Sequence, residues 1–169
     1  MIDREYCRML AAYNRWMNER VYAICAGLDD ADRRRDMGAF FRSVDGTLNH
    51  LLWADLIWLS RFTGRPAPTT RIDEPVHQDF RELRAAREAL DREILDWAAA
   101  IDEDWLAAPF TWTRSTDDSE HTRPAWMLVT HYFQHQVHHR GQLTTLLMQL
   151  GHDPGVTDLP FMPGADATA

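Results

Sequence analysis

The sequence predicts an all-α protein, a four-helix bundle with a small β-hairpin between the third and fourth helices. Four long stretches carry apolar side chains at spacings of three and four, as amphipathic helices do. The chain has 169 residues, of which 45% are hydrophobic, and this is enough for one domain with its own core. Helices with one apolar face are most economically buried in a bundle. We therefore expect a single domain over residues 1–169, with the last few residues frayed.

The first two helices are expected at residues 3–28 and 39–63. Apolar residues recur through the first from Tyr6 to Leu28, and the charged run DDADRRRD then forms a connection. The second is rich in leucine and aromatic residues, and it stops at the glycine–proline segment TGRPAP.

The third and fourth helices are expected at residues 76–101 and 124–150. The third has one apolar stripe and a charged opposite face, whereas the fourth begins at Pro124 and ends before Gly151, both typical of helix ends. Between them, FTWT and HTR are predicted to be two short strands and STDDSE their turn. After the fourth helix, the segment DLPFMP is apolar enough to dock on the body of the protein.

Composition excludes several functions. The net charge of −8 opposes nucleic-acid binding. No apolar run of about 18 residues predicts a membrane span, and the first residues do not form a secretory signal. Cys7 and Cys25 would lie roughly 27 Å apart along one helix, too far for a disulfide. All 18 basic residues are arginine, which excludes a lysine Schiff base. We expect a cytoplasmic protein without nucleic-acid or membrane partners.

Four of the eight histidines lie in the segment HYFQHQVHHRGQ, and on a helix they share one face about 100° wide. These residues are His131, His135, His138 and His139. His135 and His139 are four residues apart, a spacing at which two imidazoles on adjacent turns can bind one metal ion. His131 and His135 have the same spacing and form the competing pair.

A third ligand is expected from a facing helix, as in other bundle metal sites. His50 is the natural choice, because it lies in the middle of the apolar segment GTLNHLLWADLIW. Three neutral imidazoles suit Zn²⁺, Ni²⁺, Fe²⁺ or Cu²⁺ and leave a coordination position open for water or substrate. A cluster of hydrogen-bonded structural histidines is the alternative. Outside the three ligands, His138 is expected to be a surface residue or a neighbour of the ligands. His131 is expected to be a hydrogen-bonding helix residue or a general base.

Five other polar or aromatic residues near these motifs have competing interpretations. Asn14 and Asn18 are expected on a solvated helix face, and Asp55 is expected to pair with an arginine. Arg140 would bind solvent-exposed acids or a neighbouring helix. Trp53 would line a pocket or pack in the core.

The segments NHLLWADLIWLSRF and HYFQHQVHHRGQLTTLLMQLG together resemble the DinB-like family of four-helix-bundle metalloproteins. The family pattern is a histidine on the second helix and H-x-x-x-H-R-G-Q on the fourth, and this chain matches it at His50, His135, His139, Arg140, Gly141 and Gln142. YNRWMNERV and DLPFMP are also similar to family segments, so the resemblance covers nearly the whole chain. It implies one crossover connection, a homodimer, and a divalent metal, usually zinc or nickel, held by His50, His135 and His139.

Some members of this family are thiol-dependent transferases or isomerases that use mycothiol, bacillithiol or glutathione as a metal-bound thiolate. Our first hypothesis is therefore a metal-dependent transferase that activates a low-molecular-weight thiol and acts on a small-molecule substrate. Metal-dependent hydrolysis is a lesser variant, since the chain has no H-E-x-x-H motif. The alternatives are a non-catalytic metal-binding stress-response bundle that binds a small ligand or protein, and a sensor or nickel-handling protein.

Overall fold

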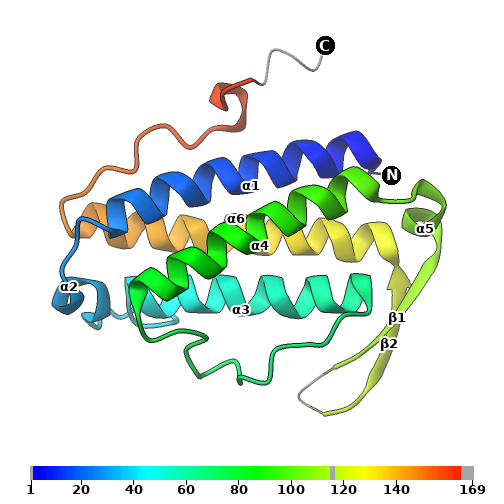
Figure 1. Ribbon diagram of the computed structural model, residues 1–169, viewed down its shortest axis with the longest axis horizontal. Coiled ribbons are helices and arrows are strands. Elements are labelled where there is room, and N and C mark those ends of the chain that lie inside the picture. The colour runs from blue at the N-terminus through cyan, green and yellow to red at the C-terminus, as the bar shows by residue number, and fades with distance from the viewer. Residues whose placement is uncertain (1, 115–116, 165–169) are drawn as a thin grey trace.

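Four long helices make up the body of the protein in a computed structural model that describes residues 2–114 and 117–164 (Figure 1). They are α1 (Arg4–Cys25), α3 (Val44–Thr63), α4 (Phe80–Ala100) and α6 (Ala125–Gln149). The short elements are the helices α2 (Asp30–Arg34) and α5 (Glu103–Ala107), the strands β1 (Pro109–Thr113) and β2 (Glu120–Pro124), and a 3₁₀ turn (Leu159–Phe161). The prediction of an all-α bundle with a small hairpin is confirmed.

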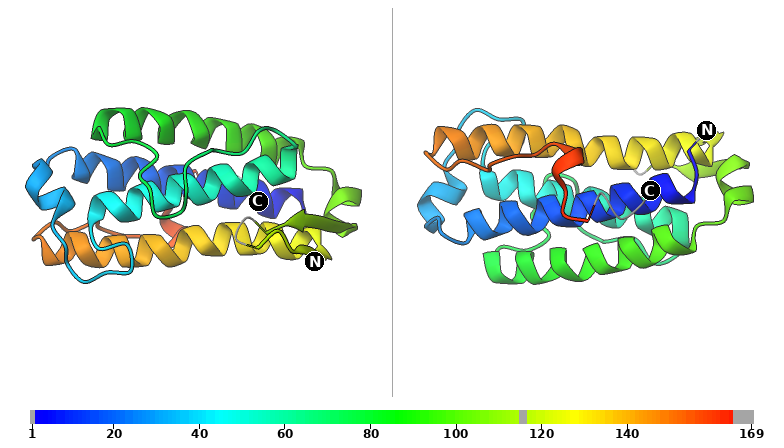
Figure 2. Two further views of the ribbon diagram at one scale, coloured as in Figure 1. Left: turned by 90° about the horizontal axis from the view of Figure 1, so that it is seen from below. Right: turned by 90° about the horizontal axis from the view of Figure 1, so that it is seen from above.

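The connection from α3 to α4, residues 64–79, crosses the length of the bundle. It leaves the end of α3 and returns along that helix, so that α4 runs in the same direction as α3 (Figures 1 and 2). Trp53 Nε1 donates to the carbonyl of Thr70 (2.8 Å), and the backbone N–H of His77 donates to Asn49 Oδ1 (3.0 Å). These bonds fix the crossover, which the family resemblance implied, against the part of α3 that carries His50.

Helix ends follow the local sequence. Asp3, Ser43 and Asp79 accept hydrogen bonds from the first backbone N–H groups of α1, α3 and α4, which satisfies donors that a helix leaves unpaired. Gly64 has a φ of 71°, in the left-handed region that favours glycine, and it ends α3. The third helix accordingly begins at Phe80 rather than at 76, because its cap is Asp79.

The second long helix begins at Val44, so its predicted start at 39 is wrong. Residues 39–43 form a tight turn in which Ala39 and Arg42 make an isolated β-bridge, and Arg42 has a φ of 68°, which no α-helix accommodates. The predicted charged connection after the first helix contains α2, whose cap is Asp29. In α5, likewise not predicted, Asp102 is the cap.

The hairpin is antiparallel and pairs Phe110 with Arg123 and Trp112 with His121. Its two predicted strands are confirmed. Of its predicted turn, Ser115 and Thr116 lie outside the described residues.

An aromatic cluster around Phe62 ties the hairpin to the end of the bundle. The ring of Phe62 stacks on Trp97 at 5.3 Å and meets Trp105, Phe110 and Tyr132 edge-on. Such aromatic pairs add to the free energy of burial, so they hold the hairpin against the end of the bundle.

After α6, the chain returns along α1 (Figure 2). The hydroxyl of Tyr13 donates to the carbonyl of Thr157 (2.6 Å), and Arg20 donates to that of Pro154 (2.7 Å). Within DLPFMP, Leu159 and Met162 are partly buried while Phe161 is exposed. The tail therefore docks, as predicted; the residues expected to fray, 165–169, are outside the described range.

Both cysteines are free, in agreement with their expected separation along one helix, and both are buried. Over the described part of the chain, the helices are all too short or too polar to cross a bilayer.

Candidate metal centre

Three histidines from two facing helices meet inside the bundle. His50 comes from α3, and His135 and His139 come from adjacent turns of α6. One ring nitrogen of each lies within 4.8 Å of the corresponding nitrogens of the other two, and such a group could hold a metal ion. The ring centres of His139 lie 4.5 Å from His50 and 4.4 Å from His135. These are the three residues that the sequence placed together.

The donor spacing fits a divalent metal. Nε2 of His50 lies 3.3 Å from Nε2 of His135. Two nitrogens bound to one tetrahedral zinc ion, each at about 2.0–2.1 Å, would lie about 3.4 Å apart. The imidazoles of His50 and His135 therefore need little movement to share an ion.

Burial keeps these imidazoles neutral at pH 7. Removal from water, together with the neighbouring imidazoles, lowers the pKa of His50 and the pKa of His135 to about 3. Burial also lowers the pKa of His139, although its bond to Gln142 opposes this. A neutral imidazole is the form that donates a lone pair to a metal.

Gln142 fixes the orientation of His139. Its Oε1 lies 2.9 Å from Nδ1 of His139, and since this oxygen can only accept, Nδ1 carries the proton. Nε2 of His139 then presents its lone pair to the other two histidines. The same amide lies 3.3 Å from His138, an exposed residue that is thus a neighbour of the triad. The sequence placed Gln142 on this helix face but gave it no role.

Two aromatic rings lie near the imidazole of His50. Phe41 stacks on the imidazole with ring centres 3.7 Å apart, and Trp53 lies at 6.2 Å. Against His50 there is also a pocket of about 350 Å³, lined by the 39–43 turn, the start of α3 and residues 72–75 of the crossover. Phe41 was missed by sequence reasoning because its segment was predicted to be helical. Trp53 lies beside His50 and anchors the crossover, but it is only partly buried and does not line this pocket, so neither of its two predicted roles is confirmed.

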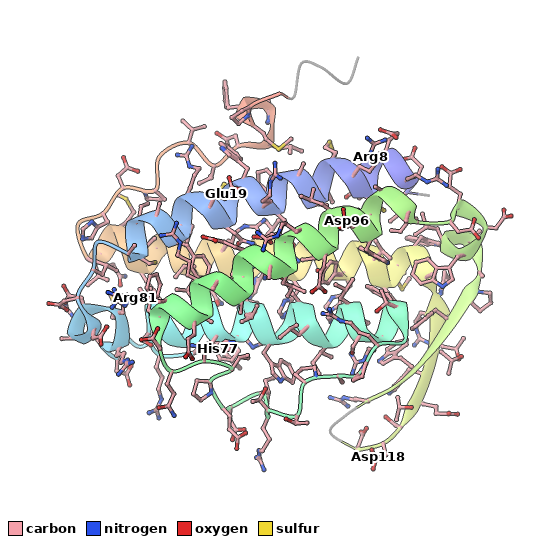
Figure 3. The ribbon with its side chains drawn as sticks, viewed as in Figure 1. Arg8, Glu19, His77, Arg81, Asp96 and Asp118 are labelled. Atoms are coloured by element: carbon pink, nitrogen blue, oxygen red, sulfur yellow. The ribbon has the colours of Figure 1, made fainter. Side chains whose placement is uncertain are left out.

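The other histidines lie outside the triad. His131 is exposed, with its ring 5.9 Å from His135 and edge-on to Trp58, and burial of part of the ring lowers its pKa. His77 lies on the crossover connection before α4 (Figure 3), where its Nδ1 is 3.5 Å from Glu82. His121 packs on Trp112 in the hairpin.

A buried network of polar side chains lies beside the triad. Arg87 on α4 binds Asp55 on α3 (2.5 Å) and Asp91 one turn along its own helix (2.9 Å). Asp91 accepts from Asn18 on α1 (3.0 Å), and Asp55 accepts from Gln136 on α6 (2.8 Å). These five residues, called here the central network, join all four long helices.

The structure distinguishes between the earlier interpretations of the polar residues. Asp55 pairs with an arginine, as predicted. Arg140 donates to Asn14 of the neighbouring α1, one of its two predicted alternatives. Asn14 and Asn18, which were expected on a solvated face, are only 1% and 6% exposed, so that prediction was wrong. Their partners, Arg140 and Asp91, keep them inside the bundle.

Comparison with known proteins identifies the family of this chain. The family model described as "DinB family" matches residues 1–167. The chain belongs to the DinB family. It is also similar to Protein DinB of Bacillus subtilis (strain 168), with 22% identity over 169 residues that cover 91% of each chain. The family's H-x-x-x-H-R-G-Q segment is the part of α6 that supplies two histidines of the triad and Gln142.

Proposed function

We propose that this protein binds one divalent metal ion, zinc or nickel, through His50, His135 and His139, and uses it to activate a low-molecular-weight thiol for transfer to a small-molecule substrate. The observation that carries the proposal is the convergence of three neutral imidazoles from two helices, those of His50 and His139 buried and that of His135 partly buried. Without an ion, such a cluster places like charges close together in the interior whenever two of its imidazoles are protonated. Membership of the DinB family supports the same conclusion.

When bound, a divalent ion supplies a Lewis acid that lowers the pKa of a thiol or water at its open position. The histidines orient the ion, and Gln142 holds His139 in the tautomer that ligation needs. Phe41 stacks on the imidazole of His50 and, with Trp53 beside it, limits how that ring can rotate.

His131 is the candidate general base. It is exposed, its lowered pKa keeps it neutral at pH 7, and its ring lies 5.9 Å from His135. A neutral imidazole at this distance can accept the proton that a thiol releases at the triad. Hydrolysis is the lesser variant, with water in place of the thiol.

Metal analysis of untagged protein tests the site. We expect about one zinc or nickel ion per chain, and loss of that ion in His50→Ala, His135→Ala and His139→Ala. His138→Ala, an exposed neighbour on α6, is the matched control and should retain it. His131→Ala should also retain the ion, and its loss there would favour the 131/135 pair. Full metal content in the His135→Ala and His139→Ala variants would refute the assignment.

Titration of the metal-loaded protein with glutathione, bacillithiol and mycothiol tests the activity. We expect one thiol to bind and release about one proton as it ionises. An ion that responds to no thiol would favour the non-catalytic metal-binding bundle. His131→Ala should bind the same thiol but transfer it more slowly, with the largest loss near neutral pH.

Two buried, free cysteines agree with the reducing cytoplasm in which such thiols are kept, and we propose that location.

We also propose that two copies associate along the outer face of α6. The only charged side chain in this helix is Arg140, which is buried, and Met127, Val137, Gly141 and Met148 are exposed. A face 25 residues long without an exposed charge is unusual in a chain of net charge −8 and suits a two-fold contact with itself. Figure 2 shows α6 along one edge of the bundle.

Sedimentation velocity tests this contact. We expect the wild type to be a dimer and Val137→Arg to be a folded monomer. Ala85→Arg, which adds the same charge at an exposed position on α4, should leave the dimer intact. A wild type that is monomeric throughout the micromolar range would refute the proposal.

A further inference from the structure

One hydrogen bond joins the two helices that carry the triad, close to the triad itself. Gln136 follows His135 directly on α6, and Asp55 lies five residues after His50 on α3. Gln136 Nε2 donates to Asp55 Oδ1 at 2.8 Å, and each side chain is only 1% exposed. The bond therefore connects the backbone segments that position His50 and His135.

The acceptor end of this bond is held rigidly. The second oxygen of Asp55 binds Arg87 at 2.5 Å, and Arg87 also binds Asp91, which accepts from Asn18. Asp55 is thereby anchored to α4 by its direct bond to Arg87, whereas Asn18 contacts neither Asp55 nor Arg87 and reaches them only through Asp91. Because a buried carboxylate has no water to replace a lost partner, it stays where Arg87 and Gln136 hold it.

The remaining packing between α3 and α6 is mostly apolar and has little directional preference. Leu48 and Leu52 of α3 and Leu143 and Leu147 of α6 belong to the buried core. Apolar side chains tolerate small shifts of one helix along another. A hydrogen bond between buried groups forms at only one relative position of the two helices. A shift of about 1.5 Å, the rise of one residue, would separate the ring nitrogens of His50 and His135.

We propose that Asp55 and Gln136 are positioning residues for the metal centre: their bond sets the register of α3 against α6 and so the separation of His50 from His135 and His139. The inference rests on the proposed function, because its consequence is the affinity and geometry of the metal ion. Neither residue supplies a ligand atom to the triad.

Gln136→Met tests the inference, because methionine has a similar volume but cannot donate the bond. The matched control is Asn18→Leu, which removes another buried amide from the central network, between α1 and α4. Metal affinity is measured by competition with a chelator, and the ligand geometry by the visible absorption of the Co²⁺-substituted protein. Thermal unfolding of both variants reports any general loss of stability.

We expect Gln136→Met to bind zinc at least about tenfold more weakly and to change the Co²⁺ spectrum. Asn18→Leu should lose a comparable amount of thermal stability but keep the wild-type affinity and spectrum. The inference is overturned if Gln136→Met keeps both, or if both variants lose affinity in parallel with their stability.

Crystal structures of the metal-free wild type and Gln136→Met separate this inference from the proposed function. A wild type that binds no metal refutes the proposed function alone. The 3.3 Å separation of the two Nε2 atoms then decides. If it widens in Gln136→Met, the positioning role stands, and if it is unchanged, that role is rejected as well.

Discussion

Gln142 determines which nitrogen of His139 faces the other two histidines. Its oxygen holds the proton on Nδ1, so removal of the amide frees the ring to rotate or to change tautomer. We predict that Gln142→Leu lowers zinc affinity by about 10–100-fold, as loss of a partner of a metal-bound histidine typically does. Competition with a chelating dye measures the change.

Gln134→Leu is the control for this prediction. Gln134 is exposed on the same helix, and its substitution should leave zinc affinity unchanged. Equal affinity in the wild type and Gln142→Leu would mean that packing alone orients His139.

The two thiols have their reactivity suppressed by burial. Removal from water raises the pKa of Cys7 and of Cys25 to about 12. Between about pH 8.5 and pH 12, both thiols therefore stay protonated in the folded protein, whereas the thiols of the unfolded chain lose their protons. Because the folded state then binds more protons, the thiols' contribution to the free energy of unfolding falls as pH rises from about 8.5 to 12.

We predict that native protein reacts with Ellman's reagent at pH 8 far more slowly than protein in urea, which should release two equivalents at once. Urea titrations at pH 8 and pH 10.5 should show the loss of stability, and a Cys7→Ala/Cys25→Ala variant should show less of it. Rapid reaction of both thiols in the native state would contradict the burial of these residues.

At the residue scale, a sequence pattern predicted a side chain's role correctly only where that pattern has a single structural explanation. Histidines at i and i+4 with another inside an apolar helix have few explanations, and their meeting was predicted. Asn14 and Asn18 also have helical spacing, but a polar pair looks the same on a solvated face and in a polar core. Only their partners, Arg140 and Asp91 on other helices, distinguish the two, and no local pattern identifies partners so distant in sequence.

The turn before α3 shows where an apolar pattern misleads at the scale of an element. Phe40, Phe41 and Val44 have helical spacing, yet the helix begins only at Val44, after the Ser43 cap. A serine followed by an acidic residue in the next turn was a signal for that start. Phe41 stacks on His50. This contact depends on the fold, and no local sequence pattern predicts it.

Gly46 is what allows this turn to lie against α3. A Cβ atom added there would lie 2.2 Å from the carbonyl oxygen of Phe41, a backbone atom that cannot rotate away. We predict that Gly46→Ala lowers the free energy of unfolding by about 1–3 kcal/mol, as other overpacking substitutions do. Urea unfolding measures it.

Gly141→Ala is the opposite case in the same protein. Apart from its chain neighbours and the helix's own backbone, no heavy atom lies within 4 Å of the Cβ position. Because α6 continues through this residue, alanine should stabilise the helix by about 0.5–1 kcal/mol. Similar effects of the two substitutions would mean that the turn moves freely away from α3.

At the scale of the whole molecule, the central network balances the buried charge of Arg87 with those of Asp55 and Asp91. Side chains of all three are at most 4% exposed. Burial raises the pKa of Asp55, and Arg87 opposes the shift. We predict that Arg87→Leu lowers the free energy of unfolding by about 3–5 kcal/mol, because two carboxylates are left in the interior without a cation.

Arg92→Leu is the matched control, since Arg92 is exposed on the same helix and its loss should change stability by less than about 0.5 kcal/mol. Chemical denaturation of both variants measures the difference. A small effect of Arg87→Leu would show that the two carboxylates take up protons or water at little cost.

The triad joins residues 85 positions apart in the chain, since His50 lies on the second long helix and His135 on the last. During synthesis, a ribosome that has released α3 still has the crossover, α4 and the hairpin to translate before the two ligands of α6 emerge. A nascent chain therefore has no triad, and a metal ion captured there is captured by a chain that is almost finished. If the triad binds a metal ion as proposed, that ion is acquired only after α6 has been synthesised.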